Sequence, residues 1–369
     1  MLPSTDLVVV GAGIVGLAHA AEATARGLRV TVVDRDDRAA GASVRNFGHV
    51  CTTAQSGRAL EYARVARERW VELGAKAGFE VKQCGTVVVA RTASEHAALA
   101  EFSAARPAGE VVLLDAEGVR ERFAPAGADV VGGAFLPGDL RVAPVEAVPA
   151  LAAWLEAEGV TFRWGTHVGA ISPGTVHTSR GDLSAPYVVH AVNYDVDRLF
   201  PDIADAAGVR RCRLQMFEVE APDGVRIEPG VLTGTGILRY GGMAEQPSAA
   251  AVQAELEKDR PELLDIGLNL MLTQRPDGVI VLGDTHHYDR TLPPFDDEHV
   301  AELVLREGAR LLGSPLTVRR RWRGVYAHSP TTDYLTAAPY PGVRVVSVTS
   351  GIGMTTALGL APAVLDDLL

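Results

Sequence analysis

Cysteine is scarce in this sequence, with only Cys51, Cys84 and Cys212 among 369 residues. An odd number of cysteines, none in a Cys-x-x-Cys pair, argues against a disulfide framework and favours a reducing compartment. We therefore expect a cytoplasmic protein. The length predicts two domains of about 150 residues each.

Positive charge and long apolar runs are also scarce. The chain has 35 Lys and Arg against 46 Asp and Glu, a net charge of −11, which disfavours binding to nucleic acid or to an anionic membrane. The stretch 7–23 is largely apolar, but it has no basic leader and is interrupted by Gly11, Gly13 and Gly16. We expect neither a signal peptide nor a membrane span.

What the sequence does contain is an opening βαβ unit. Leu7–Val10 is a short apolar run typical of a buried parallel strand, residues 14–26 are expected to be helical, and residues 28–33 form a second strand. The first strand and the helix are joined by Gly11-Ala12-Gly13-Ile14-Val15-Gly16, a G-x-G-x-x-G fingerprint, and Asp34 ends the second strand.

Each part of the fingerprint has a task in binding an adenine dinucleotide. Gly11 permits the tight turn, Gly13 lets the backbone approach a pyrophosphate, and Gly16 lets the helix pack close to the strand. The helix N-terminus offers amide donors and a partial positive charge. The Asp34 carboxylate accepts hydrogen bonds from a ribose and repels a 2′-phosphate. The alternative, an unrelated glycine-rich turn, does not account for strand, helix and acid together.

Two further segments favour FAD over NAD. Residues 43–49, Ser-Val-Arg-Asn-Phe-Gly-His, come after the βαβ unit, and near the C-terminus a strand leads into residues 350–355, Ser-Gly-Ile-Gly-Met-Thr, and a helix. The N-terminus of this second helix suits a flavin, because the backbone amides and the dipole of the helix would stabilise the negative charge that develops on the reduced flavin ring. The residues expected to bind the nucleotide are Gly11, Gly13, Ile14, Val15, Gly16, Asp34, Arg35, Ser43, Arg45, Asn46, Gly48, His49, Val168, Gly351, Ile352, Gly353, Met354 and Thr355.

With these motifs the sequence resembles the D-amino-acid oxidase superfamily, which includes glycine oxidase and sarcosine oxidase. The resemblance covers nearly the whole chain and includes residues 113–117, 136–139, 322–324 and 332–333. It implies oxidation of a small amine by hydride transfer to flavin N5, followed by hydrolysis of the imine. Oxygen or another acceptor would then reoxidise the flavin.

The resemblance also implies a glycine oxidase-like α/β fold. In that fold a Rossmann-type FAD-binding domain is interleaved with a β-rich α+β substrate domain, and no linker-like tract divides this chain. We assign residues 1–85, 142–212 and 328–369 to the FAD-binding domain. Residues 86–141 and 213–327 are assigned to the substrate domain.

Departures from the family pattern narrow what we expect of the flavin attachment and of the substrate. Superfamily members that attach flavin covalently use a cysteine close to the position of Gly324, so FAD should be non-covalent here. Tyr326 stands where glycine oxidase carries the arginine that grips the substrate carboxylate, which argues against a simple amino acid. Residues 43–48, 213–216 and 283–288 resemble a branch associated with phosphonate breakdown, which implies an N-alkylated aminoethylphosphonate as substrate.

Hydride transfer needs few protein groups, and the catalytic candidates are His49, His287 and Tyr326. His49 either faces the flavin or caps a loop. Adjacent strand residues point to opposite faces, so at most one of His286 and His287 enters the pocket, and their spacing is poor for a metal; we expect none. The residues expected to bind the substrate are Arg239, Tyr240, His286 and Trp322.

An anionic substrate group calls for arginine, and the candidates are Arg45, Arg239 and Arg323. The basic run of residues 319–323 is expected to be mostly solvated or ion-paired surface. Three alternatives stay open. The first is an oxidase of glycine or sarcosine in which another arginine substitutes at the pocket. The others are an NAD-dependent dehydrogenase and a nucleotide-binding sensor without catalysis.

Overall fold

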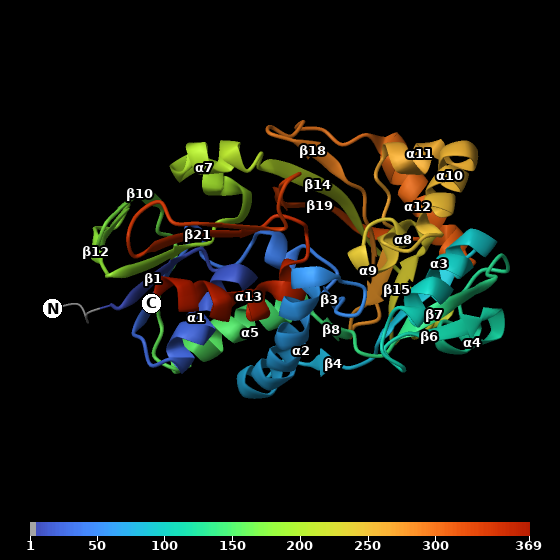
Figure 1. Ribbon diagram of the computed structural model, residues 1–369, viewed down its shortest axis with the longest axis horizontal. Helices are drawn as coiled ribbons and strands as arrows, with labels where there is room; N and C mark the ends of the chain where they lie inside the picture. The colour runs from blue at the N-terminus through green and yellow to red at the C-terminus, as the bar shows by residue number, and fades with distance from the viewer. Residues whose placement is uncertain (1–4) are drawn as a thin grey trace.

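Two sheets organise the chain, and Figure 1 shows them side by side with helices on their outer faces. The computed structural model describes residues 5–369, so residues 1–4 of the first expected domain segment lie outside the described residues. The six-stranded sheet has the order β20 (Tyr334–Ala337), β21 (Val343–Val348), β13 (Tyr187–His190), β1 (Leu7–Val10), β2 (Val30–Val33) and β9 (Thr161–Arg163).

The carboxyl ends of the parallel strands meet at one edge of this sheet. Strands β21, β13, β1, β2 and β9 run parallel, with β20 antiparallel at the margin. Every residue of β1 and β2 is buried, which agrees with their continuous apolar sequences. The parallel edge therefore brings together Gly11 at the end of β1, Asp34 at the end of β2 and the glycine turn beyond β21.

Helices α1 (Ile14–Ala25) and α13 (Gly353–Leu368) pack on one face of the six-stranded sheet, and α2 (Gly57–Ala77) and α5 (Pro144–Ala157) pack against these two helices. The expected βαβ unit is confirmed, since α1 begins directly after the fingerprint's second glycine. Trp70 of α2 is fully buried, and its Nε1 donates to the carbonyl oxygen of Met354 at 2.7 Å. This bond ties α2 to the first turn of the C-terminal helix.

The second sheet has nine strands and is built from residues 86–136 and 210–328. Its order is β18 (His287–Asp289), β14 (Arg210–Val219), β17 (Ile280–Gly283), β16 (Met271–Gln274), β15 (Gly230–Thr233), β5 (Thr86–Ala90), β7 (Gly132–Leu136) and β6 (Val112–Asp115), with β19 (Val318–His328) also paired to β14. The segments of the two sheets alternate along the sequence. The domain boundaries expected from the sequence stay a prediction.

Smaller elements complete the fold. The helices that accompany the second sheet are α3 (Ala93–Ala104), α4 (Ala116–Arg122), α8 (Gly234–Ile237), α9 (Gly241–Ala244), α10 (Ala249–Asp259), α11 (Pro261–Asp265) and α12 (Glu298–Leu312). Two three-stranded sheets are formed by β10 (Val168–Ser172), β11 (Thr175–Thr178) and β12 (Leu183–Ser184), and by β3 (His49–Val50), β8 (Leu140–Val142) and β4 (Val81–Lys82). Helices α6 (Val196–Leu199) and α7 (Pro201–Ala206) precede β14. Within residues 5–369 no helix is long and apolar enough to cross a membrane.

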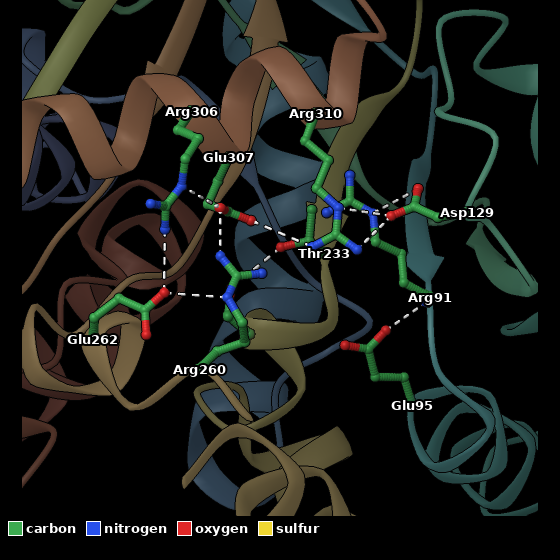
Figure 2. A network of polar contacts seen from close by, with 10 residues as sticks. Arg91, Glu95, Asp129, Thr233, Arg260, Glu262, Arg306, Glu307 and Arg310 are labelled. Atoms are coloured by element: carbon green, nitrogen blue, oxygen red, sulfur yellow. Dashed lines mark hydrogen bonds and ion pairs between the residues drawn. The ribbon is translucent and has the colours of Figure 1, made fainter. Parts of the chain in front are cut away.

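A polar network fastens α12 to the elements around it (Figure 2). Buried Glu307 accepts from Arg260 at 2.6 Å and from Arg306 at 3.3 Å. Arg310 donates to Asp129 at 2.7 Å, and Arg91 lies 3.4 Å from the same carboxylate. Because acidic and basic side chains alternate in this network and pair with one another, we interpret the network as structural.

Candidate active site

A large cavity opens at the carboxyl edge of the parallel sheet and extends to the nine-stranded sheet. It encloses about 2020 Å³ of empty space, part of it open to solvent. Both glycine turns line it, and a Cβ atom placed on Gly353 would lie 3.9 Å from Cγ2 of Ile14. The first turns of α1 and α13 therefore stand next to each other at one site.

The opening turn depends on glycine for steric reasons. Gly11 has φ +104°, and a Cβ there would collide with the carbonyl oxygen of Ala191. A Cβ on Gly16 would collide with the carbonyl oxygen of Gly11, so this glycine allows α1 to approach the strand end. Gly16 itself does not line the cavity.

Asp34 lies at the end of β2 and faces the opening turn. Its carboxylate accepts from the backbone N–H of Ala12 at 2.7 Å and of Asp36 at 3.0 Å. Burial raises the pKa of Asp34, partly opposed by these two hydrogen bonds. Next to it, Arg35 pairs with Asp195 at 2.8 Å, and both side chains line the cavity.

The segment 43–48 folds back onto α1. Ser43 Oγ accepts from the backbone N–H of Ile14 at 2.8 Å. Asn46 holds the turn together: its Nδ2 donates to the carbonyl of Ala42 at 2.9 Å, and its Oδ1 accepts from Gly48 N at 2.7 Å. Gly48 has φ +70° and does not line the cavity, whereas the exposed Arg45 does.

The closing turn presents the start of α13 to the cavity. Gly351 has φ +79°, and a Cβ there would lie 2.8 Å from Cζ of Tyr326. The first amides of a helix have no intrahelical acceptor and carry partial positive charge. Thr355 Oγ1 accepts from Cys51 N at 3.2 Å, which joins this turn to the segment after β3. Of the residues expected to bind the nucleotide, all but Gly16 and Gly48 line the cavity.

The other end of the cavity lies against the nine-stranded sheet and centres on Arg239. This residue stands between α8 and α9; its Nη2 donates to the Tyr326 hydroxyl at 2.5 Å, and its Nη1 to the Tyr288 hydroxyl at 3.3 Å. Burial raises the pKa of Tyr326 well above its ordinary value despite Arg239, so the phenol stays neutral. Leu214, Tyr240 and Met271 add a mostly apolar wall.

Asp284 is an acidic side chain in the same part of the cavity. It comes directly after β17, is 6% exposed, and its Oδ1 has no hydrogen-bond partner among the described residues. Its backbone exchanges two hydrogen bonds with Asn269, at 2.9 and 3.0 Å. Burial raises the pKa of Asp284 to about 7, although Arg239 and the Asn269 side chain oppose the shift.

His49 reaches the cavity wall from β3. Its Nε2 lies 2.6 Å from Thr86 Oγ1 and 3.5 Å from Oδ2 of the fully buried Asp139, whose Oδ1 accepts from Thr53 N at 2.8 Å. His49 therefore combines both expectations, since it lines the cavity and also makes local side-chain contacts. Its role stays a prediction.

Three of the residues expected to take part in catalysis or to bind the substrate also lie outside the cavity. His287 is exposed on β18, whereas His286 lines the cavity with its Nδ1 2.9 Å from the Gly267 carbonyl oxygen. One of the two histidines enters the cavity, as expected, and it is not His287, the one predicted to be catalytic. Trp322 donates from Nε1 to the Arg45 carbonyl oxygen at 3.1 Å, which supports the turn, and its side chain does not line the cavity. Arg323 donates to Asp296 at 2.7 Å and to the carbonyls of Pro293 and Pro294.

The rest of the basic run is also ion-paired, as expected: Arg319 with Glu220, Arg320 with Glu218 and Arg321 with Glu298. Sequence reasoning missed Asp284, Asn269 and Asp139. A lone acid or amide after an apolar strand usually lies at the surface, and only tertiary pairing buries these side chains.

Comparison with known proteins decides the family. The DAO family profile, described as FAD dependent oxidoreductase, matches residues 6–366. The chain belongs to this family of FAD-dependent oxidoreductases. Membership answers the choice between FAD and NAD, and the cavity fits FAD by its own geometry: two helix N-termini and the carboxylate of Asp34 line one continuous space.

Solved structures share the fold over almost the whole chain. L-Proline dehydrogenase from P. horikoshii has a TM-score of 0.79 at 20% identity, covering 98% of this chain and 92% of that one. Glycine oxidase from Geobacillus kaustophilus has a TM-score of 0.79 at 20% identity, with coverage of 99% and 94%. L-α-Glycerophosphate oxidase from Mycoplasma pneumoniae, with FAD bound, has a TM-score of 0.78 at 17% identity, with coverage of 100% and 95%. No curated protein sequence matches the chain significantly.

Proposed function

We propose that this protein oxidises a small amine that carries one anionic group, with that group held by Arg239. The observation that carries the proposal is the position of Arg239 in the same cavity as the two glycine turns, with its guanidinium held by Tyr326 and Tyr288. A guanidinium has five N–H donors, so two phenol contacts leave donors for a forked contact with a carboxylate or phosphonate.

The chain's own residues would share the work of binding and orientation. We assign the ribose contact to Asp34, the pyrophosphate to the amides of the opening turn, and the flavin to the closing turn. When bound, FAD supplies the acceptor for the hydride. Leu214, Tyr240 and Met271 would exclude bulk water around the α-carbon while Arg239 holds the distal anion, which fixes the substrate's orientation. Release of the imine into water allows its hydrolysis.

The substrate class we propose is an N-alkylated aminoethylphosphonate, from which hydride removal and hydrolysis give phosphonoacetaldehyde and an amine. It is supported by the sequence strings of residues 43–48, 213–216 and 283–288. Arg239 favours a second candidate as well. Arg239 supplies the guanidinium that position 326 lacks, so a small amino acid such as glycine or sarcosine is the alternative candidate for the substrate.

Turnover with a matched panel separates the two candidates. We would compare kcat/KM for N-methyl-aminoethylphosphonate, sarcosine, glycine and D-alanine, measuring peroxide release and, in parallel, reduction of an artificial acceptor. The phosphonate should be preferred by at least about tenfold, a difference of about 1.4 kcal/mol in transition-state binding. Preferred turnover of an amino acid would overturn the phosphonate assignment and support the second candidate.

A further inference from the structure

Asp284 is a buried acid that the nucleotide-binding residues leave unused. It lines the cavity, is 6% exposed, and its Oδ1 is without a hydrogen-bond partner among the described residues. The paired backbones of Asn269 and Asp284 fix its position. A buried carboxylate oxygen that lacks a donor is costly to retain, so it indicates a site that a donor occupies during function.

The surroundings of Asp284 hold little compensating positive charge. His286 Nε2 lies 3.9 Å from its Oδ2, but burial and then Arg239 lower the pKa of His286 well below its ordinary value. Burial raises the pKa of Tyr240, and it raises that of Cys212 on β14 to about 12, so both stay neutral. Only Arg239 is charged among these groups, and its Nη atoms contact two phenols.

We propose that Asp284 is the base that removes a proton from the substrate's ammonium group. The proposal rests on the proposed function and adds the residue that prepares the amine. In the step, an N–H bond of the ammonium breaks, its electron pair stays on nitrogen, and an O–H bond forms on Asp284. An alkylammonium has no lone pair to assist departure of a hydride from the neighbouring carbon, whereas the free amine does.

Arg239 and Asp284 together also suit a zwitterionic substrate, which carries one anionic and one cationic group. Arg239 offers donors to the anionic end, and Asp284 offers an acceptor to the cationic end within the same cavity. Alkylammonium groups ordinarily titrate near pH 10, so almost every substrate molecule arrives protonated at neutral pH. A base whose own pKa lies near 7 is ionised in about half of the molecules at that pH and can accept the proton.

The test is the pH dependence of flavin reduction in Asp284→Asn, measured anaerobically with whichever panel amine reduces the wild-type protein. The variant should be at least about 100-fold slower at pH 7, within the usual contribution of a general base. In the variant, the acid limb near pH 7 that belongs to Asp284 should be absent. The rate of flavin reduction should instead rise about tenfold per pH unit until the pH reaches the pKa of the amine. Asp289→Asn, at an exposed residue of β18, is the matched control and should behave as wild type.

A second measurement uses only the wild-type protein and decides the matter if the variant does not fold with bound FAD. Two amines whose pKa values differ should give the same acid limb near pH 7 in kcat/KM. An acid limb that moves with the pKa of each amine would overturn the proposal, as would a variant with wild-type rate and profile. If no amine reduces the wild-type flavin, the proposed function fails; if one does and the variant is unaffected, only the assignment of Asp284 fails.

Discussion

The guanidinium of Arg239 donates to the hydroxyl of Tyr326 at 2.5 Å, although the two residues are 87 positions apart in the sequence. Tyr326 also packs against the closing turn, where a side chain on Gly351 would meet its ring. One phenol therefore lies between the turn expected to hold the flavin and the arginine expected to hold the substrate. In the proposed function, this arrangement would put the anionic end of the substrate close to the flavin.

Replacing Arg239 should weaken substrate binding. In Arg239→Gln we expect kcat/KM for an anionic amine to fall roughly 10- to 100-fold, mostly through KM, because hydrogen bonds to charged groups contribute about 1.5–3 kcal/mol. FAD content should be unchanged. Steady-state kinetics test this, with Arg323→Gln as the control, since Arg323 is ion-paired to Asp296 outside the cavity. Equal effects of the two substitutions would contradict the role given to Arg239.

The opening turn should not tolerate a methyl group at Gly16. A Cβ there would collide with the Gly11 carbonyl oxygen, so Gly16→Ala must displace either the turn or α1. We expect purified Gly16→Ala protein to lack FAD and to unfold at lower temperature. Gly169→Ala is the control, because Gly169 is exposed outside the cavity and a Cβ at that position meets nothing within 4 Å. Full FAD content in Gly16→Ala would show that the turn is less constrained than its geometry indicates.

Asp284 should make stability depend on pH. Its pKa is about 7 in the folded protein against 3.8 ordinarily, so its contribution is fully present below about pH 4 and is lost as the pH rises through 7. The Asp284→Asn variant avoids this loss. Its free energy of unfolding should exceed that of the wild type by up to about 4 kcal/mol at pH 8, and by less at pH 5.5. Urea unfolding at both pH values measures it. A difference that does not change with pH would contradict the raised pKa.

His49 is expected to act at the flavin side of the cavity. His49→Asn removes a ring that lies 2.6 Å from Thr86 Oγ1 and leaves buried Asp139 without its neighbour. We expect flavin reduction to slow by about tenfold or more while FAD stays bound, as for loss of a group that assists the chemistry. Thr86→Val is the comparison variant. If it slows the reaction as much as His49→Asn does, the histidine serves local structure only.

The nucleotide-binding half was the more predictable part of the chain. Gly11, Asp34 and the closing turn each lie at the end of a parallel strand, and parallel strands bring their carboxyl ends together, so their proximity is a consequence of the order of elements. The profile match over residues 6–366 and the fold-level matches bear out the expected fold and cofactor.

The substrate end was less predictable because it depends on tertiary contacts. Alternation predicts that only one of two adjacent histidines enters the cavity, but it does not say which, and the structure turns His286 inward. The aromatic side chain of Trp322 suggested a substrate-binding residue, yet its indole donates to the Arg45 carbonyl oxygen and so supports that turn. Arg239 meets Tyr326 only through the tertiary packing of the loop between α8 and α9 near β19, which no local pattern encodes.

We propose that one cavity holds FAD and delivers a small amine to it. The most direct test of this proposal is anaerobic addition of the amine panel to the purified protein while the absorbance of oxidised flavin is recorded. We predict one FAD per chain and bleaching by at least one anionic amine. Protein that neither carries nor takes up FAD, or whose flavin stays oxidised with every amine, would contradict the account.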